Sequence, residues 1–240
     1  MKKILMATSL LFLVLSACQS AQPPSQQAQA SGAAPSTQAP NVQSSGNLCD
    51  NPYVPAVEGA TWTSNVHSEL GDDTQIDTVT DAGSDAFLVE TVVRDLDYVI
   101  TWTCIPEGLL WLQTDGGMFS AIFQVEGSTS TWETVSYSGV SVPKDIQPGD
   151  TWSSFEQLNV TDSTGSRSYD IGIDFHAVGM ESVTVPAGTF NAMRIDLTMS
   201  WTSQYGEVSV PISDWFAAGV GLVKSSSGST LLELVSYSIP

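Results

Sequence analysis

The side chains that could act as nucleophiles, proton carriers or metal ligands are few in this sequence of 240 residues. Three cysteines, Cys18, Cys49 and Cys104, and two histidines, His67 and His176, are the first candidates. The histidines lie far apart, and neither Cys49 nor Cys104 has a histidine near it in the sequence. No nucleophile elbow, zinc-ligand spacing or phosphate-binding glycine loop occurs. We therefore expect no catalytic residue, no metal site and no cofactor.

Cys18 ends the pattern Leu-Ser-Ala-Cys at residues 15–18, which follows two lysines and an apolar run over residues 4–15. This order is typical of a secretory signal peptide, and the run is too short to span a bilayer stably. The pattern resembles the lipobox of bacterial lipoproteins. That resemblance implies a signal peptide over residues 1–17 and a diacylglyceride on Cys18, which with a further acyl chain gives stable anchoring. A plain cleavable signal, in which Cys18 is incidental, is the alternative.

The segment after Cys18 consists almost entirely of Gln, Ser, Ala and Pro up to about residue 46, and it carries no charge. Such a composition cannot bury enough apolar surface to fold. We expect residues 18–46 to be a disordered tether between the lipid on Cys18 and an extracytoplasmic domain. The membrane is therefore an expected partner, reached through that lipid. On the lipoprotein resemblance, Gln19 implies the outer membrane if the cell has two membranes, and the cell surface otherwise.

The sequence is strongly acidic, with a formal net charge of −19 from 26 acidic and seven basic residues. Loss of Lys2 and Lys3 with the signal peptide leaves five basic residues against those 26, a charge of about −21. A polyanion repels nucleic acids and anionic lipid headgroups. We expect no nucleic-acid partner. Solubility outside the cell explains the acidity, and cation binding is the alternative.

Cys49 and Cys104 remain as a pair once Cys18 is assigned to lipid. In an exported, oxidising setting this favours a disulfide between them. A disulfide that closes the loop of 55 residues between them would stabilise the fold by about 4 kcal/mol on the chain-entropy model. Two free buried thiols are the alternative.

Apolar and polar residues alternate in the region 47–240, which we expect to form a single antiparallel β domain. Every second residue is apolar over residues 168–177 and 193–201, which is the period of a strand with one face in water. Antiparallel sheets show this alternation. Turn signals such as Pro-Ala-Gly at 186–188 separate the predicted strands. Ser213 and Asp214 are placed to cap one short helical turn through residues 215–218.

Two short motifs recur in the same order along this domain. Gly-Ala-Thr-Trp at 59–62 returns as Gly-Asp-Thr-Trp at 149–152, and Trp-x5-Gly-Leu occurs from Trp102 and again from Trp215. The order predicts two repeated halves, about 50–125 and 140–240. The alternative is that Gly-x-Thr-Trp merely starts a strand after a turn.

The domain resembles the exported β-domains of TapB-like proteins. The resemblance depends on the two recurring motifs and on three further segments: Asn-Pro-Tyr at 51–53, Val-Thr-Val-Pro-Ala-Gly-Thr-Phe at 183–190, and the segment 215–224 that ends Gly-Val-Gly-Leu-Val-Lys. The resemblance covers roughly residues 50–240 and concerns fold more than chemistry. More distantly, it implies the curved sheet of lipoprotein carriers with a LolA/LolB-like fold, whose concave face holds acyl chains. We therefore expect a curved antiparallel sheet, built as an open half-barrel or a two-layer sandwich.

Trp111 and Trp132 are our candidates for lining a ligand-binding groove among the seven tryptophans. Both lie beside the recurring motifs but have no counterpart in the other half. Packing in the core is the alternative for each of them, because buried aromatic rings contribute large apolar area.

Two acidic runs are the only candidates for a cation site: Asp72 and Asp73 with Asp77, and Asp81 with Asp85. Calcium needs six to eight oxygen ligands, and these spacings match no twelve-residue loop that supplies them. We interpret the runs as solvated carboxylates of hairpin connections and assign no metal ligand.

Two classes of function compete. The first is a membrane-tethered, non-enzymatic module that binds a hydrophobic ligand on a curved sheet. The second is an envelope structural or assembly protein that contacts another protein through strand edges or a sheet face. They differ in whether the concave face is hollow. A secreted hydrolase is a third interpretation, since Ser153 and Ser154 neither support nor exclude a Ser-His-Asp arrangement.

Overall fold

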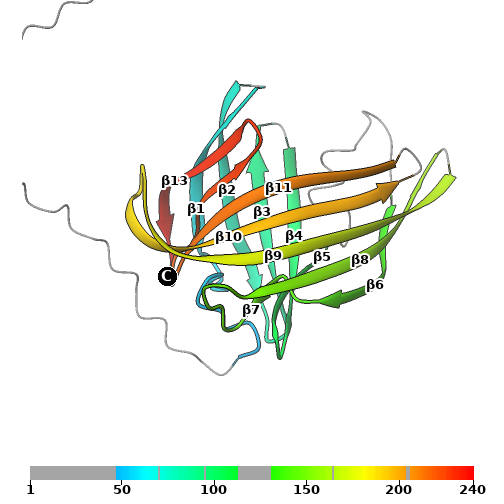
Figure 1. The fold of residues 1–240 in the computed structure, drawn as a ribbon, viewed down its shortest axis with the longest axis horizontal. Coiled ribbons are helices and arrows are strands. Elements are labelled where there is room, and N and C mark those ends of the chain that lie inside the picture. Colours follow the sequence, from blue (N-terminus) through cyan, green and yellow to red (C-terminus); the bar gives the residue numbers. More distant parts are fainter. Residues whose placement is uncertain (1–46, 70, 95, 113–130, 164, 204–205) are drawn as a thin grey trace, which may run out of the picture. The chain divides into compact units, whose positions relative to one another are not determined.

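The structure is a computed structural model that describes residues 47–240, except residues 70, 95, 113–130, 164 and 204–205 (Figure 1). The predicted signal peptide, Cys18 and the predicted tether at 18–46 lie outside the described residues. Over the described ranges, no helix is long and apolar enough to cross a membrane.

Within these ranges, thirteen strands form one antiparallel sheet in the order β6-β8-β9-β10-β11-β12-β13-β1-β2-β3-β4-β5-β7 (Figure 1). The all-β prediction is confirmed, and the arrangement is one continuous open sheet rather than a two-layer sandwich. The strands are β1 (Thr61–Ser68), β2 (Gly71–Ala82), β3 (Ala86–Val93), β4 (Leu96–Ile105), β5 (Gly108–Leu112), β6 (Thr131–Gly139), β7 (Val142–Pro143), β8 (Thr151–Asp162), β9 (Gly165–Val185), β10 (Gly188–Ser203), β11 (Gly206–Ala217), β12 (Gly221–Ser227) and β13 (Thr230–Ser238).

Strand β9 shows why these residues form a sheet with two different faces. Its apolar residues at 171, 173, 175 and 177 are buried, whereas the polar residues at 170, 174 and 176 are exposed, as the alternation predicts. Each fully buried Ile or Phe side chain contributes about 1.5–3 kcal/mol relative to an exposed one. Burial of one face therefore determines which residues of β9 point inward.

The helical turn expected after Ser213 is wrong. Residues 213–217 belong to β11, which pairs with β10 on one side and β12 on the other. Two paired neighbours supply more backbone hydrogen bonds than one isolated helical turn, so the capping signal is overridden.

The sheet consists of two meanders, β1 to β5 and β8 to β12, joined in two ways. Strand β13 pairs with both β12 and β1. On the other side β6 pairs with β8, and β7 pairs with β5, so the two edge strands of the sheet are consecutive in the chain. Only Val140 and Ser141 separate these edge strands.

The ends of the sheet approach each other closely at that link. The backbone N–H of Val140 donates to Ser153 O of β8, and that of Ser141 donates to Leu109 O of β5. A Cβ atom on Gly139 would lie 2.1 Å from Ser153 O, and one on Gly108 would lie 2.2 Å from Val142 O. Glycine is required at both positions because backbone atoms occupy the place of a side chain.

The main hydrophobic core shows that the sheet is curved. It unites Val79 of β2 and Phe87 of β3 with Leu158 of β8, Phe175 of β9 and Ile195 of β10, which lie far apart in the strand order. Side chains of distant strands can meet only if the sheet bends around them. A second, smaller cluster packs where the β9–β10 hairpin meets β11 to β13.

The recurring Gly-x-Thr-Trp motifs have the same backbone geometry in both meanders. Gly59 N–H donates to Val79 O (2.9 Å), as Gly149 N–H donates to Ala177 O (2.7 Å). The returning bonds, from Val79 N–H to Ala60 O and from Ala177 N–H to Asp150 O, are both 2.9 Å long. Each motif therefore begins the first strand of a meander in the same way.

Cys49 and Cys104 form a disulfide with a Cα–Cα distance of 4.9 Å. Both residues are buried, and Cys104 lies on β4, where its backbone N–H donates to Asp85 O. The bridge ties the segment that precedes β1 to the main core.

Candidate functional site

The concave side of the sheet encloses a cavity of about 420 Å³ that side chains leave open. This volume lies within the range of about 300–1,000 Å³ that is typical of small-molecule sites. Strands β1 to β5 and β9 to β13 contribute to its wall. The apolar wall includes the aromatic residues Trp62, Phe87, Trp102, Trp111, Phe175 and Phe216 and the aliphatic residues Ile173, Ile195, Leu197, Met199, Ile212 and Leu232.

One row of aromatic side chains crosses three strands of this wall. Phe87, Trp102 and Trp111 are successive cross-strand partners on β3, β4 and β5. The ring centroids of Phe87 and Trp102 are 5.9 Å apart, and those of Trp102 and Trp111 are 6.4 Å apart, with both pairs stacked. Cross-strand aromatic pairs of this kind stabilise a sheet and hold the rings in fixed orientations.

Trp111 is the member of this row with an unused polar group. Its backbone N–H donates to Ser141 Oγ at 3.0 Å. Its indole Nε1 is buried and has no hydrogen-bond partner among the described residues. A buried N–H without an acceptor is unfavourable, because the hydrogen bond that it makes to water in the unfolded chain is not replaced.

Asp214 places a carboxyl group on the same cavity wall. It lies on β11 between its cross-strand partners Ile195 of β10 and Ser225 of β12. Its Oδ1 atom is buried without a hydrogen-bond partner in the part of the chain that the structure describes. Burial raises the pKa of Asp214 to about 6, although a hydrogen bond from Ser225 opposes this shift.

Asp77 is the second carboxyl group on the wall, and unlike Asp214 it accepts a hydrogen bond at each of its two oxygens. Thr91 Oγ1 donates to its Oδ1 at 2.7 Å, and Gln75 Nε2 donates to its Oδ2 at 2.9 Å. Burial raises the pKa of Asp77, and these two hydrogen bonds oppose the shift. Burial, with the charge of Asp77, also raises the pKa of Tyr98 to about 12.

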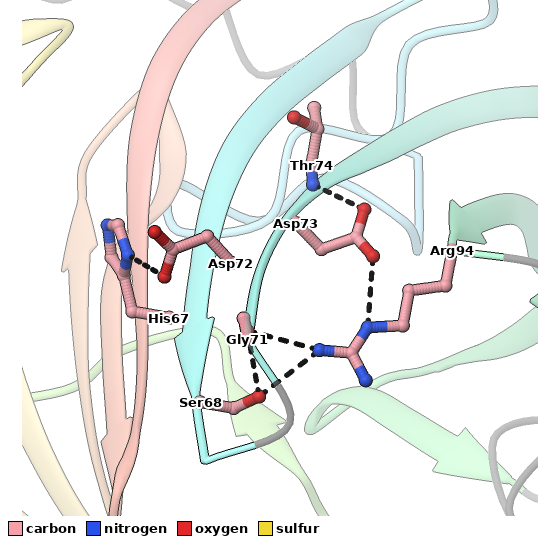
Figure 2. A network of polar contacts seen from close by, with 7 residues as sticks. All are labelled: His67, Ser68, Gly71, Asp72, Asp73, Thr74 and Arg94. Carbon is pink, nitrogen blue, oxygen red and sulfur yellow. Dashed lines mark hydrogen bonds and ion pairs between the residues drawn. The ribbon is translucent and has the colours of Figure 1, made fainter.

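The other members of the acidic runs lie away from the cavity. Figure 2 shows Asp72 beside His67 (2.8 Å) and Asp73 beside Arg94 (2.9 Å) at the β1–β2 hairpin. Arg94 Nη2 also donates to Ser68 Oγ and to the carbonyl oxygen of Gly71. Asp72 therefore pairs with its cross-strand partner His67, and Asp73 pairs with Arg94 of the β3–β4 connection.

The remaining two aspartates, Asp81 and Asp85, are exposed near the β2–β3 connection. Over the described ranges, no group of three or more His, Cys, Asp or Glu side chains is arranged to hold a metal ion.

The two predicted groove residues occupy different places. Trp111 lines the cavity. Trp132 of β6 stacks on Tyr169 of β9 with centroids 6.5 Å apart and packs against the main core, and it is not among the lining residues. His176 is exposed on the outer face of β9, and its cross-strand partners are Thr151 and Asp196.

Sequence reasoning missed Asp214 as a site residue because it was interpreted as a helix cap. A usable signal was present, since Ile212, Asp214 and Phe216 alternate with the residues of the opposite face. A lone carboxylate within an inward-facing apolar series marks a buried polar group.

Comparison with known proteins gives a family and a fold. A family model described as DUF3108-like matches residues 114–239. A candidate exported protein with a YmcC-like fold from Bacteroides fragilis superposes with a TM-score of 0.52 at 14% identity, covering 79% of this chain and 100% of that one. A candidate lipoprotein from Parabacteroides distasonis superposes with a TM-score of 0.50 at 15% identity, covering 79% and 99%. No curated protein matches the sequence.

Proposed function

The chain belongs to the DUF3108-like family, and we propose that it is a lipid-anchored, extracytoplasmic protein that binds a hydrophobic ligand without catalysing a reaction. The observation that carries this proposal is the apolar cavity of about 420 Å³ on the concave side of the sheet. Well-formed apolar cavities with a few polar groups are the usual form of small-molecule sites.

The physical driving force is burial of apolar surface. When a ligand enters the cavity, its apolar surface is removed from water, which favours binding by about 25 cal/mol for each Å² of apolar area. It also restores dispersion contacts to wall residues that face open space, such as Leu197 and Ile212. The stacked row of Phe87, Trp102 and Trp111 adds apolar aromatic side chains to the wall that an acyl chain or another apolar group would meet.

The proposed location rests on the Cys18 motif and the composition of residues 19–46. The descriptions of the two similar structures, a candidate exported protein and a candidate lipoprotein, support it. On this proposal the lipid on Cys18 brings the acidic domain to a membrane whose anionic headgroups would otherwise repel it. The resemblance to TapB-like proteins stays a prediction.

The alternative role in envelope assembly is less well supported. A filled concave face would favour an assembly component, whereas a hollow one favours ligand binding, and the cavity lies on the concave face. We therefore place ligand binding first.

A binding assay tests the proposal on the mature chain carrying Cys18→Ser, exported and purified without detergent. We expect saturable binding of the neutral fluorescent probe N-phenyl-1-naphthylamine, and native mass spectrometry should show a co-purified lipid mass. Leu197→Trp fills the cavity and should weaken probe binding about tenfold. Thr198→Trp, on the exposed face of the same strand, is the matched control and should bind normally. Absence of binding to the parent protein, or equal binding by the two variants, would refute the proposal.

A further inference from the structure

The charges in the wall of the cavity indicate what kind of hydrophobic ligand it can hold. Resting on the proposed function, we propose that the ligand is a hydrophobic ammonium compound, in which an amine that is protonated at neutral pH carries a long apolar chain. The apolar wall takes the chain, and the negative charges of Asp77 and Asp214 favour the ammonium group. These charges act through their electric field and need no direct contact with the ligand.

The two aspartates lie on different parts of the same wall. Asp77 is on β2 and Asp214 is on β11, and the strands β12, β13 and β1 lie between them in the sheet. Both residues line the cavity of about 420 Å³, so a ligand that fills it lies within the field of both charges. An apolar cavity weakens electric fields less than water does, and the interaction with a charged ligand is correspondingly stronger.

Asp77 has the hydrogen bonds of an ionised carboxylate. Gln75 Nε2 donates to Oδ1 at 3.2 Å and to Oδ2 at 2.9 Å, and Thr91 Oγ1 donates to Oδ1 at 2.7 Å. A protonated carboxyl group carries a donor on one of its oxygens, whereas an ionised one only accepts. Both donors are neutral side chains, so they leave the negative charge in place.

The pKa shifts of the two carboxyl groups indicate that no protein cation compensates them. Burial raises the pKa of Asp77 and raises that of Asp214 to about 6, and only hydrogen bonds from neutral side chains oppose these shifts. A cation nearby would lower the pKa of a carboxyl group. At pH 7.5 the wall therefore carries negative charge that a cationic ligand can neutralise.

The cations of the domain lie outside the cavity wall. The five basic residues and two histidines of region 47–240 are all among the described residues, and none of them lines the cavity. Arg194 and Lys224, on the strands that flank β11, pair instead with Asp196 (2.8 Å) and Glu233 (3.6 Å). A fatty-acid carboxylate in the cavity would therefore meet like charge without a counter-ion, and the net charge of −19 adds to the repulsion.

An ammonium group also suits the wall better than a neutral head group does. Burial of a charge is costly unless an opposite charge compensates it, and a neutral ligand leaves the two carboxylates uncompensated. An ammonium group has only donors and needs oxygen acceptors. Besides the carboxylates, Ser225 and Ser227 of β12 and Thr230 of β13 contribute hydroxyl groups to the wall.

The test compares three ligands that share a dodecyl-type chain: dodecylamine, 1-dodecanol and laurate. Binding to the mature chain carrying Cys18→Ser is measured at pH 7.5 by displacement of N-phenyl-1-naphthylamine, with each ligand below the concentration at which it forms micelles. We expect dodecylamine to bind about tenfold more tightly than 1-dodecanol, and laurate about tenfold more weakly than 1-dodecanol. Binding of 1-dodecanol or laurate that equals or exceeds that of dodecylamine would overturn the proposal. If neither the probe nor any of the three binds, the proposed function fails instead.

Adsorption of the amine on the acidic surface of the protein is separated from binding in the cavity by Leu197→Trp. This variant fills the cavity and leaves the surface charge unchanged. Isothermal titration calorimetry should show that dodecylamine binds it about tenfold more weakly than it binds the parent. Equal binding of dodecylamine to the two proteins would place the amine on the surface and overturn the proposal.

Variants of the two aspartates assign the preference to their charges. Asp77→Asn and Asp214→Asn should each reduce the preference for dodecylamine over 1-dodecanol about threefold, and the double variant should abolish it. Retained binding of 1-dodecanol shows that these variants are folded. Asp174→Asn removes the same charge from the exposed face of β9 and should keep the preference. An unchanged preference in the double variant would overturn the proposal.

Gln75→Lys tests the same charges while keeping both aspartates. It adds a cation to the wall beside Asp77, so the preference for dodecylamine should fall and laurate should bind more tightly than it binds the parent. This variant keeps the proposal testable if the aspartate variants do not fold. Laurate binding no tighter than in the parent would contradict selection by charge.

Discussion

The indole Nε1 of Trp62 donates a 2.6 Å hydrogen bond to the carbonyl oxygen of Val220, 158 residues further along the chain. Trp62 belongs to the first recurring Gly-x-Thr-Trp motif, and Val220 directly precedes the glycine of the second Trp-x5-Gly motif. The bond thus ties the start of one meander to the last hairpin of the other. Trp152 has a similar role, donating from its Nε1 to Ser141 O at 3.2 Å beside the link between the sheet edges.

Trp62→Phe should therefore destabilise the protein. The change leaves the Val220 carbonyl oxygen without this donor and removes part of a ring that packs against both hydrophobic clusters. We expect a loss of about 2–4 kcal/mol in the free energy of unfolding, measured by urea denaturation. Trp152→Phe should cost less, because its hydrogen bond is longer. Equal stability of Trp62→Phe and the parent would contradict this role.

Removal of the disulfide should have a comparable effect. Cys49 and Cys104 close a loop of 55 residues, which corresponds to about 4 kcal/mol on the chain-entropy model. The double variant Cys49→Ser/Cys104→Ser should lose roughly that amount in urea denaturation. Reduction with dithiothreitol should lower the parent's midpoint and leave the double variant unchanged. A midpoint insensitive to reductant in both proteins would mean that the bridge contributes nothing.

The stability of the protein should depend on pH through Asp214. Its pKa is about 6 in the folded state, compared with 3.8 for an unperturbed carboxyl, so the folded state holds the proton more tightly than the unfolded state. The contribution of Asp214 to stability is therefore fully present below pH 3.8 and is lost as the pH rises through 6. Relative to Asp214→Asn, the parent should gain up to about 3 kcal/mol between pH 7 and pH 4.

Urea denaturation of both proteins at several pH values measures this difference. Asp77 and the surface carboxylates are common to the two proteins, so their effects cancel in the comparison. Parallel stability curves for the parent and Asp214→Asn would show that Asp214 has an ordinary pKa in the fold.

The hairpin network in Figure 2 should matter little for stability, because its ion pairs are partly exposed. Arg94 has a φ of 55°, a left-handed conformation that glycine adopts without strain. Arg94→Ala should lose at most about 1 kcal/mol through the Asp73 pair. Arg94→Gly loses the same pair but relieves the backbone, so it should be at least as stable as Arg94→Ala. The opposite order in thermal unfolding would show that the greater backbone freedom of glycine in the unfolded chain outweighs any strain that it relieves at this position.

Membrane attachment should depend on Cys18. With Cys18→Ser the domain should move from the membrane pellet to the soluble fraction, because the apolar anchor is lost. Fractionation and immunoblotting measure this, with Cys49→Ser/Cys104→Ser, in which Cys18 is intact, expected to stay in the pellet. If the Cys18→Ser protein is cleaved and still sediments with membranes, the anchor lies elsewhere.

The features of the fold that were predictable are those whose sequence pattern lies within one strand or one turn. Alternation in β9 and β10, the turn at residues 186–188 and the Cys49–Cys104 pairing depend on local pattern or on a count of residues. Asp214 was not predictable in the same way. Its burial depends on β10 and β12 lying on either side of it and on the curvature of the whole sheet. The same holds for the indole nitrogen of Trp111, which has no hydrogen-bond partner among the described residues, because the lack of a partner depends on all the neighbours of an atom at once.

The close approach at Gly108 and Gly139 has a consequence for how such proteins can vary. Any side chain at either position would collide with the backbone of the neighbouring strand, which is β7 for Gly108 and β8 for Gly139. Neither glycine is among the residues that line the cavity, but Gly108 lies against Val142, which is one of them. The width of the cavity can therefore be changed by mutation at Gly108, a position outside its wall.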